Sequence, residues 1–340
     1  MGHPTNLELG MKKQRRSCMK AGAVALAMAA SGAAFTAGAA APAWPVRPIT
    51  IVVPYAPGGN TDLMARLIGD QLAKALHVPV VVDNKAGAAG LIAAEYVARS
   101  PADGYTLFMG TLTQISTAPF TNKIRYDPVK DFVPIANVGG NPFVITVNAR
   151  VPARDVQELI AYAKKNPGKL NMGNAGVGGL THLSALVFAK YTGIDVVEVP
   201  YKGASLALGD VVAGQIDMYS GNLSEVVPYA RDPRVRLLGV SSRNRVKQLP
   251  DVPALAESVS GIPEVETWNG LLGPAGMPAE AVDRIAGAVL AALAEPAFRK
   301  KLEDAGITPL PEAKEQFAQR IRRDIEVWKP MIEMAGIKPE

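Results

Sequence analysis

The segment Pro54-Tyr55-Ala56-Pro57-Gly58-Gly59-Asn60-Thr61-Asp62 joins two stretches with different apolar periods. Before it, Ile49–Val53 is a short run rich in β-branched residues. After it, apolar residues recur at helical spacing, namely Met64, Leu67, Ile68, Leu72 and Leu76. A strand pattern that turns into a helix pattern across two glycines predicts a strand-to-helix unit whose helix packs on the strand.

The same alternation continues along the chain and predicts parallel sheets covered by helices. Further strands are expected over residues 78–82, 106–110, 170–173, 195–199, 215–219, 235–241 and 268–272. Helices are expected over residues 91–99, 156–165, 180–191, 205–213, 279–294, 296–305 and 314–334, and residues 249–263 read as a connecting loop with a short helix. Two apolar runs within residues 134–149 are separated by Gly139-Gly140-Asn141-Pro142, where the chain can pass from one lobe to another.

These units predict an α/β protein of two lobes with doubly wound sheets and a ligand cleft between the lobes. Residues 44–141 and 267–340 form lobe 1 in this interpretation, and residues 142–266 form lobe 2. Ligands of open α/β sheets bind outside the carboxyl ends of the strands, so the strand-to-helix loops carry the candidate site.

Residues 1–43 have the layout of an export signal that is cleaved. Lys12, Lys13, Arg15, Arg16 and Lys20 precede a weakly apolar run, and small-residue cleavage candidates follow. Arg15-Arg16 leaves both twin-arginine export and ordinary secretion open, and Met1 and Met11 both remain candidate starts. Without this segment 31 bases and 30 acids remain, so the net charge of +5 gives no sign of a nucleic-acid partner. The expected location is the periplasm.

The remaining 297 residues hold no cysteine and two histidines, His77 and His182. Thiol nucleophiles, disulfides and thiolate metal sites are excluded there, and a histidine-rich metal cluster lacks imidazoles. No Gly-x-Ser-x-Gly elbow is present. The inventory argues against an enzyme and predicts no metal and no cofactor.

Two Gly-rich loops follow predicted strands and lead into predicted helices. In the first, Asn60 or Thr61 can cap the helix, and free N–H groups at its start can cradle a carboxylate. The second is Gly173-Asn174-Ala175-Gly176-Val177-Gly178-Gly179-Leu180-Thr181-His182, which matches no complete dinucleotide fingerprint. It can supply a second anion cradle facing the first, while an ordinary turn at either loop stays open.

Several motifs in order resemble the periplasmic solute receptors of tripartite tricarboxylate transporters, also called Bug proteins. They comprise Trp44-Pro45-Val46-Arg47-Pro48-Ile49, the Pro-Gly-Gly-Asn-Thr-Asp run that continues to Arg66, Asp83-Asn84-Lys85-x-Gly87, the 173–182 loop, Val199-Pro200-Tyr201-Lys202-Gly203, Gly214-Gln215-Ile216-Asp217 and Trp268-x-Gly270-x-x-Gly273-Pro274. The resemblance covers nearly all of residues 44–340. It implies a Venus-flytrap receptor that closes on a small carboxylate and presents it to a large and a small transmembrane transporter subunit; a sensor kinase is an alternative partner.

The resemblance also implies that backbone amides and ordered water of the two facing loops hold the carboxylate. Carried over residue by residue, the candidate ligand-binding set is Tyr55, Pro57, Gly58, Gly59, Asn60, Thr61, Asp62, Thr111, Thr113, Gln114, Asn174, Ala175, Gly178, Gly179, Thr181, Tyr201, Lys202 and Asp217. Gly179 departs from the Ser commonly found at its position, which removes one hydroxyl donor.

The roles of the charged candidates stay open at this point. Lys202 either neutralises a distal carboxylate or is a surface residue, and Asp217 is expected at the end of a strand at the cleft. Asp62 and Asp217 would repel an acidic ligand unless they accept from a donor. They would be the general base of the alternative function, an exported two-lobe enzyme. His182 is expected to pack or cap, and Trp268 to pack at the hinge.

Overall fold

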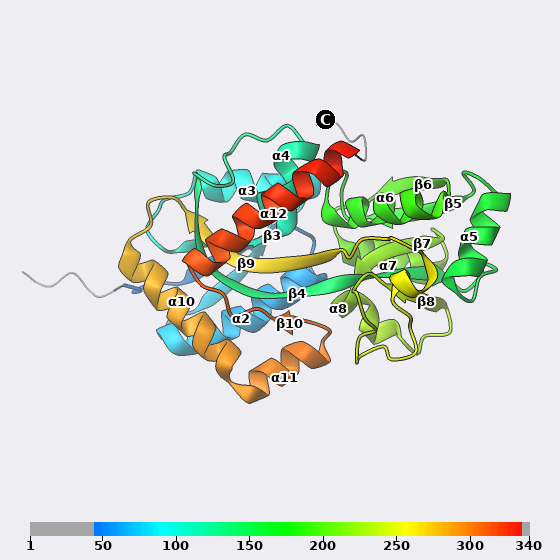
Figure 1. The fold of residues 1–340 in the computed structure, drawn as a ribbon. Helices are drawn as coiled ribbons and strands as arrows, with labels where there is room; N and C mark the ends of the chain where they lie inside the picture. The colour runs from blue at the N-terminus through cyan, green and yellow to red at the C-terminus, as the bar shows by residue number, and fades with distance from the viewer. Residues whose placement is uncertain (1–43, 335–340) are drawn as a thin grey trace, which may run out of the picture. The chain divides into compact units, whose positions relative to one another are not determined.

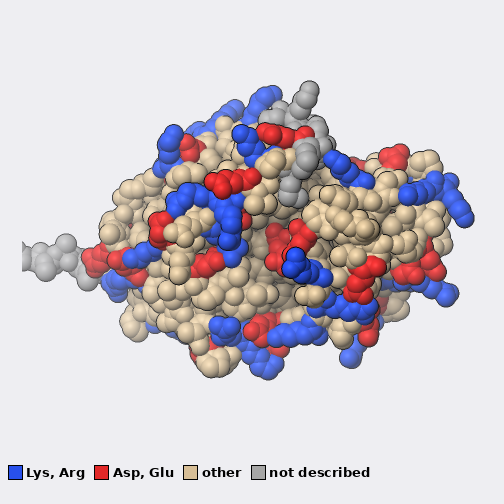
Figure 2. Space-filling model, viewed as in Figure 1, with Lys and Arg blue, Asp and Glu red and all other residues tan. Residues whose placement is uncertain are grey.

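The computed structural model describes residues 44–334. The predicted export signal at residues 1–43 lies outside the described residues. In the described part, lysines and arginines alternate with acids over the face shown in Figure 2, as the nearly balanced charge after residue 43 leads one to expect. No helix in that part is long and apolar enough to cross a membrane.

The first half of the fold is a sheet with the strand order β2-β1-β3-β9-β4, and the short strand β10 (Thr308–Pro309) also pairs with β4. Its strands are β1 (Ile49–Val53), β2 (Val80–Asn84), β3 (Thr106–Thr111), β9 (Glu266–Pro274) and part of β4 (Phe132–Asn148). One face is covered by α2 (Asn60–Leu76), α10 (Ala279–Ala294) and α11 (Pro296–Asp304), and the other by α3 (Leu91–Ala98) and α12 (Glu315–Met334). The apolar stripe of α2 is buried against β1, as its spacing predicts.

The second half is built on β7 (Met218–Asn222), β5 (Leu170–Asn174) and β6 (Val196–Pro200), with β8 (Val235–Val240) paired to β4. Its two apolar cores lie on opposite faces. One core includes α5 (Val156–Lys165) and α6 (Leu180–Thr192), and the other α7 (Ala204–Ala213) and α8 (Leu223–Val226). Short elements complete the chain: η1 (Ala88–Gly90), η2 (Thr113–Thr117), α4 (Ala118–Thr121), η3 (Val227–Tyr229), α9 (Leu255–Ser258) and β10 (Thr308–Pro309).

One strand, β4, joins the two halves. Residues Phe132 to Pro142 pair with β9, and residues Phe143 to Asn148 pair with β7 and β8 (Figure 1). The two apolar runs on either side of Gly139-Gly140-Asn141-Pro142 belong to one continuous strand, because the backbone stays extended there and the ladder with β9 continues to Pro142, after which the chain enters the second half. The predicted parallel pairing is found within β2-β1-β3 and within β7-β5-β6, while β4 and β9 run antiparallel to their neighbours. The predicted two-lobe α/β class is confirmed.

Most predicted elements fall within about three residues of the observed ones. The difference that matters most for the site is in β7, which was predicted over residues 215–219 and spans Met218–Asn222. Asp217 therefore precedes this strand and lies at its amino end, not at the carboxyl end where the cleft is. The prediction that Asp217 lies at the cleft was wrong.

Candidate ligand-binding site

A pocket lies where loops from the two halves of the fold meet. The first half contributes Tyr55, Gly59, Asn60, Thr61, Thr111, Thr113, Thr267 and Asn269. The second half contributes Phe143, Ala175, Leu180, Thr181, Ala204, Asn222 and Glu225. None of these lining residues is Lys, Arg or His, and Glu225 is the one acid among them.

Gln114 sets the hydrogen bonding of the Tyr55 hydroxyl at this pocket. Its Oε1 accepts from the backbone N–H of Thr111 (3.1 Å), and its Nε2 donates to the carbonyl oxygen of Ala89 (2.7 Å), which fixes the orientation of the amide. The same Nε2 donates to Tyr55 Oη (2.9 Å). The Tyr55 hydroxyl is also hydrogen-bonded to the Thr113 side chain, so these two hydroxyls share one hydrogen bond and keep one proton between them for another acceptor.

Two threonine hydroxyls at the pocket also accept a hydrogen bond from an N–H group. Thr113 Oγ1 accepts from the N–H of Leu180 (3.0 Å), and Thr181 Oγ1 accepts from the N–H of Ala175 (2.8 Å). Thr181 therefore keeps its own O–H for another acceptor, whereas the Thr113 hydroxyl is also hydrogen-bonded to the Tyr55 hydroxyl, so that pair keeps one proton for another acceptor. Together the three lining hydroxyls have two protons to offer, and none of the three carries a charge.

The start of α2 does not match the predicted capping. Its N-cap residue is Gly59, without a side-chain cap, so the expectation that Asn60 or Thr61 caps the helix was wrong. Instead, Glu225 from the second half of the fold accepts from the N–H of Asn60 through Oε1 (3.1 Å). The first-turn N–H of Asn60 has no acceptor within its own helix, so the α2 anion cradle holds a carboxylate of the protein itself.

Three further bonds hold the Glu225 carboxylate. Asn222 donates its N–H to Oε2 and its Nδ2 to Oε1, both at 2.9 Å, and Tyr219 Oη donates to Oε2 (3.2 Å). Burial raises the pKa of Glu225 above its ordinary value, and the N–H groups of Asn60 and Asn222 oppose that rise. Burial likewise raises the pKa of Tyr55 and, further, that of Tyr219, so both phenols are neutral donors near pH 7.

Asn269 on β9 adds a donor that the rest of the site leaves unused. Its Oδ1 accepts from Thr61 Oγ1 (2.8 Å), while its Nδ2 is buried with no hydrogen-bond partner among the described residues. Asn269 itself is fully buried and lines the pocket. A buried polar atom without a partner is costly, so this amide is well placed to serve a bound group.

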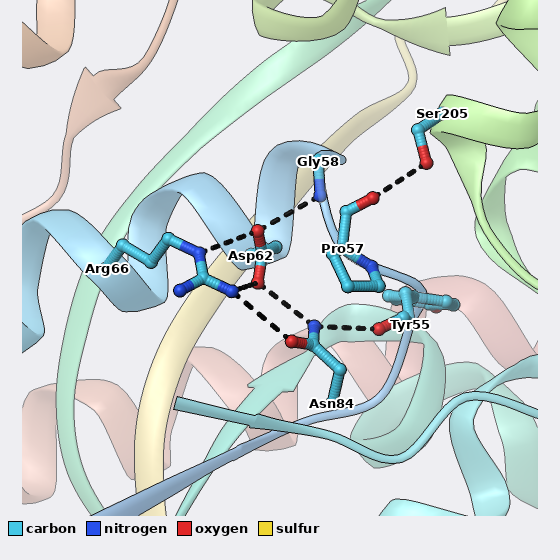
Figure 3. Close-up of polar contacts among 7 residues, drawn as sticks. All are labelled: Tyr55, Pro57, Gly58, Asp62, Arg66, Asn84 and Ser205. Carbon is cyan, nitrogen blue, oxygen red and sulfur yellow. Dashed lines mark hydrogen bonds and ion pairs between the residues drawn. The ribbon is translucent and has the colours of Figure 1, made fainter. Parts of the chain in front are cut away.

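Asp62 is a structural residue of the first loop, as Figure 3 shows. Its carboxylate accepts from the Gly58 N–H (3.0 Å), from Arg66 Nε and Nη2 (2.9 Å each) and from Asn84 Nδ2 (3.0 Å), which also donates to the carbonyl of Tyr55. Burial acts to raise the pKa of Asp62, but the Arg66, Gly58 and Asn84 donors prevail and hold that pKa below its ordinary value. The network shapes the loop and leaves Asp62 outside the pocket lining.

Other predicted residues of the second half also have local roles. Asn174 Nδ2 donates to Glu198 (2.9 Å), and its Oδ1 accepts from the Gly176 N–H (3.0 Å). Tyr201 Oη donates to Asp210 (2.6 Å), which with burial raises the pKa of Tyr201 to about 12. Asp217 Oδ2 accepts from the Asn171 N–H (2.8 Å). None of these three predicted residues lines the pocket.

Contacts across the two halves involve several more predicted residues. The carbonyls of Pro57 and Gly178 accept from Ser205 Oγ (2.9 Å) and Thr121 Oγ1 (3.1 Å), and the carbonyl of Lys202 accepts from the Ala56 N–H (3.3 Å). Tyr201 and Lys202 line a second hollow that shares Tyr55 and Ala175 with the pocket. The two halves are thus closed on each other around the pocket.

The structure also shows the local roles of three single residues, His182, Gly179 and Trp268. His182 Nδ1 accepts from the N–H of Gly178 (3.1 Å), which is the capping role expected of it. Gly179 is the N-cap of α6, and the absence of a side chain leaves that cap without a hydroxyl. Trp268 is buried, packs edge-on against Phe317 and donates to Asp324 (2.7 Å), so it is a packing residue.

Of the seven lining residues in the second half, the predicted set contains only Ala175 and Thr181. Asn222 ends β7 and Glu225 lies in α8, and the misplaced end of that strand hid them. Phe143 and Asn269 lie inside strands, where no loop motif marks them. The Asn-x-x-Glu spacing of a capping box at residues 222–225 is the one signal that could have drawn attention to Glu225.

A two-lobe α/β fold with an interlobe pocket of neutral donors defines a periplasmic binding protein. The family model "Tripartite tricarboxylate transporter family receptor" matches residues 64–337, so the chain belongs to this family. It is 37% identical to a UPF0065 protein of Pseudomonas sp. (strain P51), over 85% of this chain and 87% of that one.

Solved structures agree with this assignment. The periplasmic binding protein BugD is 33% identical, with a TM-score of 0.84 over 87% of this chain and 100% of that chain. R. palustris Rpa4515 with adipate is 34% identical, with a TM-score of 0.85 over 87% of this chain and 100% of that chain. The predicted membership of the Bug family is confirmed.

Proposed function

We propose that this protein is a periplasmic receptor that binds a small carboxylate in the interlobe pocket and delivers it to the large and small membrane subunits of a tripartite tricarboxylate-type transporter. One observation carries the proposal: the three lining hydroxyls of Tyr55, Thr113 and Thr181 each accept from an N–H, and together they keep two protons to donate, one from Thr181 and one from the hydrogen-bonded pair of Tyr55 and Thr113. Such donors bind a carboxylate more strongly than a neutral acceptor, because hydrogen bonds to a charged oxygen are about twice as strong as neutral ones.

In this proposal residues 44–141 and 267–340 form one lobe and residues 142–266 the other, with β4 and β9 as the hinge region. A ligand touching Tyr55 and Thr181 at once binds both lobes. It favours the closed state only to the extent that it binds that state more tightly than the open one. The bonds that already cross the interface, such as Ser205 to Pro57, then add to closure. The adipate bound in the R. palustris relative supports the choice of a carboxylate.

The alternative, an exported enzyme, receives little support from the geometry. Asp62 is engaged by Arg66, Asn84 and Gly58, and Asp217 lies at the far end of β7. Neither carboxylate lines the pocket as a general base would.

The test is thermal unfolding of the protein, purified after export, against a panel of monocarboxylates, dicarboxylates, tricarboxylates, amino acids and aromatic acids. A ligand at 100 times its Kd should stabilise the protein by about 2.7 kcal/mol, a shift of several degrees. Mass spectrometry then shows whether the acid is recovered unchanged. Recovery of the unchanged acid supports a receptor, conversion supports the enzyme, and no shift with any acid contradicts the carboxylate proposal.

A further inference from the structure

A ring of three buried hydrogen bonds joins the two lobes at the edge of the pocket. Ser224 Oγ donates to Asn60 Oδ1 (2.7 Å), and Asn141 Nδ2 donates both to Asn60 Oδ1 (3.1 Å) and to Ser224 Oγ (3.0 Å). All three side chains are buried. Since the serine hydroxyl has one proton and the amide nitrogen has two, each bond of the ring has a defined direction.

Residues of both lobes form this ring. Asn60 is the first residue of α2, and Asn141 lies in the part of β4 that pairs with β9, so both belong to lobe 1. Ser224 belongs to α8 of lobe 2. Opening of the lobes would therefore keep the bond between Asn60 and Asn141 and break the two bonds of Ser224, whose hydroxyl reaches both amides only in the closed state.

The residue after Ser224 completes the same contact. Glu225 Oε1 accepts from the Asn60 N–H, which has no acceptor within α2, and the N-cap residue Gly59 has no side chain to supply one. A carboxyl oxygen can accept this N–H whether the group is charged or neutral. Helix α2 is thus capped by lobe 2, and the cap exists only in the closed state.

We propose that Ser224 is a positioning residue that sets the balance between the open and closed states, and thereby the affinity of the pocket. Ser224 does not line the pocket, whereas its partner Asn60 does. Its bonds favour closure before a ligand is bound, so the unliganded protein has a closed population. A ligand of the closed state then has an apparent Kd equal to its intrinsic Kd divided by the closed fraction. This inference rests on the proposed function and deepens it, because it concerns the regulation of the same pocket.

The first measurement is the distance between two spin labels in the absence of ligand. The substitutions Asp70→Cys on α2 and Gly209→Cys on α7 place one label on each lobe at exposed positions, and Cys18→Ser removes the one native cysteine. Double electron–electron resonance on this unliganded protein should show an open and a closed distance. Ser224→Ala in the same background should shift the population toward the open distance.

Ser184→Ala is the matched control, because it removes a serine hydroxyl that is equally buried but bonds within one lobe. Ser184 Oγ and Ser220 Oγ are 2.8 Å apart and both belong to lobe 2. The control should lower the unfolding temperature about as much as Ser224→Ala does, while it leaves the distance distribution unchanged. A merely structural role for Ser224 would make the two variants behave alike.

The second measurement is calorimetric titration with adipate and with every other acid of the thermal panel that stabilises wild type. Ser224→Ala should raise the Kd of all these acids by the same factor, about two- to tenfold, because the bonds of Ser224 form on closure and involve no ligand atom. The order of the acids by affinity should stay as in wild type.

The outcomes separate the two proposals. The role of Ser224 is wrong if unliganded wild type has no closed population, if Ser224→Ala leaves the distances unchanged, or if Ser184→Ala shifts them equally. A change in Kd that differs between acids would mean that Ser224 acts on the ligand itself, which also contradicts a positioning role. If no acid binds but Ser224→Ala shifts the unliganded protein toward the open distance, the carboxylate function fails and control of closure by Ser224 stands.

Discussion

Glu225 and Asn60 lie 165 residues apart and are joined by a 3.1 Å hydrogen bond from the Asn60 N–H to Glu225 Oε1. The bond connects α8, which follows β7, to the first residue of α2. It crosses the interface between the two halves of the fold and lies at the edge of the pocket. Closure and the charge of the pocket therefore depend on the same carboxylate.

Tyr55→Phe should weaken ligand binding by up to about tenfold, because it removes one hydrogen-bond donor worth about 0.5–1.5 kcal/mol. Titration calorimetry with the acid identified by the thermal panel measures the change. Tyr201→Phe is the matched control, since its hydroxyl bonds to Asp210 outside the pocket. Equal affinity for Tyr55→Phe and wild type would remove Tyr55 from the proposed site.

Gln114→Leu should lower both stability and affinity. The substitution leaves the Thr111 N–H and the Ala89 carbonyl without their buried partner, at a cost of about 1–3 kcal/mol each. It also frees the Tyr55 hydroxyl to turn. Denaturant unfolding and ligand titration measure the two effects, and a variant with wild-type stability would contradict the assigned bonding.

Gly176→Ala should impair closure of the lobes. Gly176 has a φ of +127°, and an added Cβ would come within 2.9 Å of the Ala89 Cα across the interface. Because the ligand must then offset the strain of closing, the apparent Kd should rise. Small-angle scattering with saturating ligand should show a larger radius of gyration than wild type. Gly209→Ala is the control, because a Cβ there meets no atom within 4 Å.

Asp62 should make stability depend on pH in the acid range. Its pKa in the folded protein lies below the ordinary value of 3.8, so its contribution is complete above about pH 4 and is lost as the pH falls through the folded-state pKa. In Asp62→Asn, the unfolding free energy should fall less steeply with acid than in wild type. Chemical unfolding from pH 6 to pH 2.5 tests this, and parallel curves for the two proteins would refute it.

The sequence by itself determined the class of the fold and half of the site. The change from strand to helix periodicity across residues 54–62 and 173–182 depends on turn residues and on the spacing of buried residues, and both can be read directly from the sequence. The resemblance to the receptor family then pointed to Tyr55, Thr113 and Thr181, which lie in or near the loops after β1, β3 and β5.

Only the tertiary structure decided which distant segments contact the two loops and line the pocket with them. β4 continues through Gly139-Gly140-Asn141-Pro142 because residues 266–269 of β9 pair with it there, and no local sequence pattern reveals so distant a partner. Asp62 turns to Arg66 and Asn84, while Glu225 reaches Asn60 across the interface. Hydrogen bonds between distant segments depend on how the lobes pack, so the charge of the pocket became visible only when both lobes were in place.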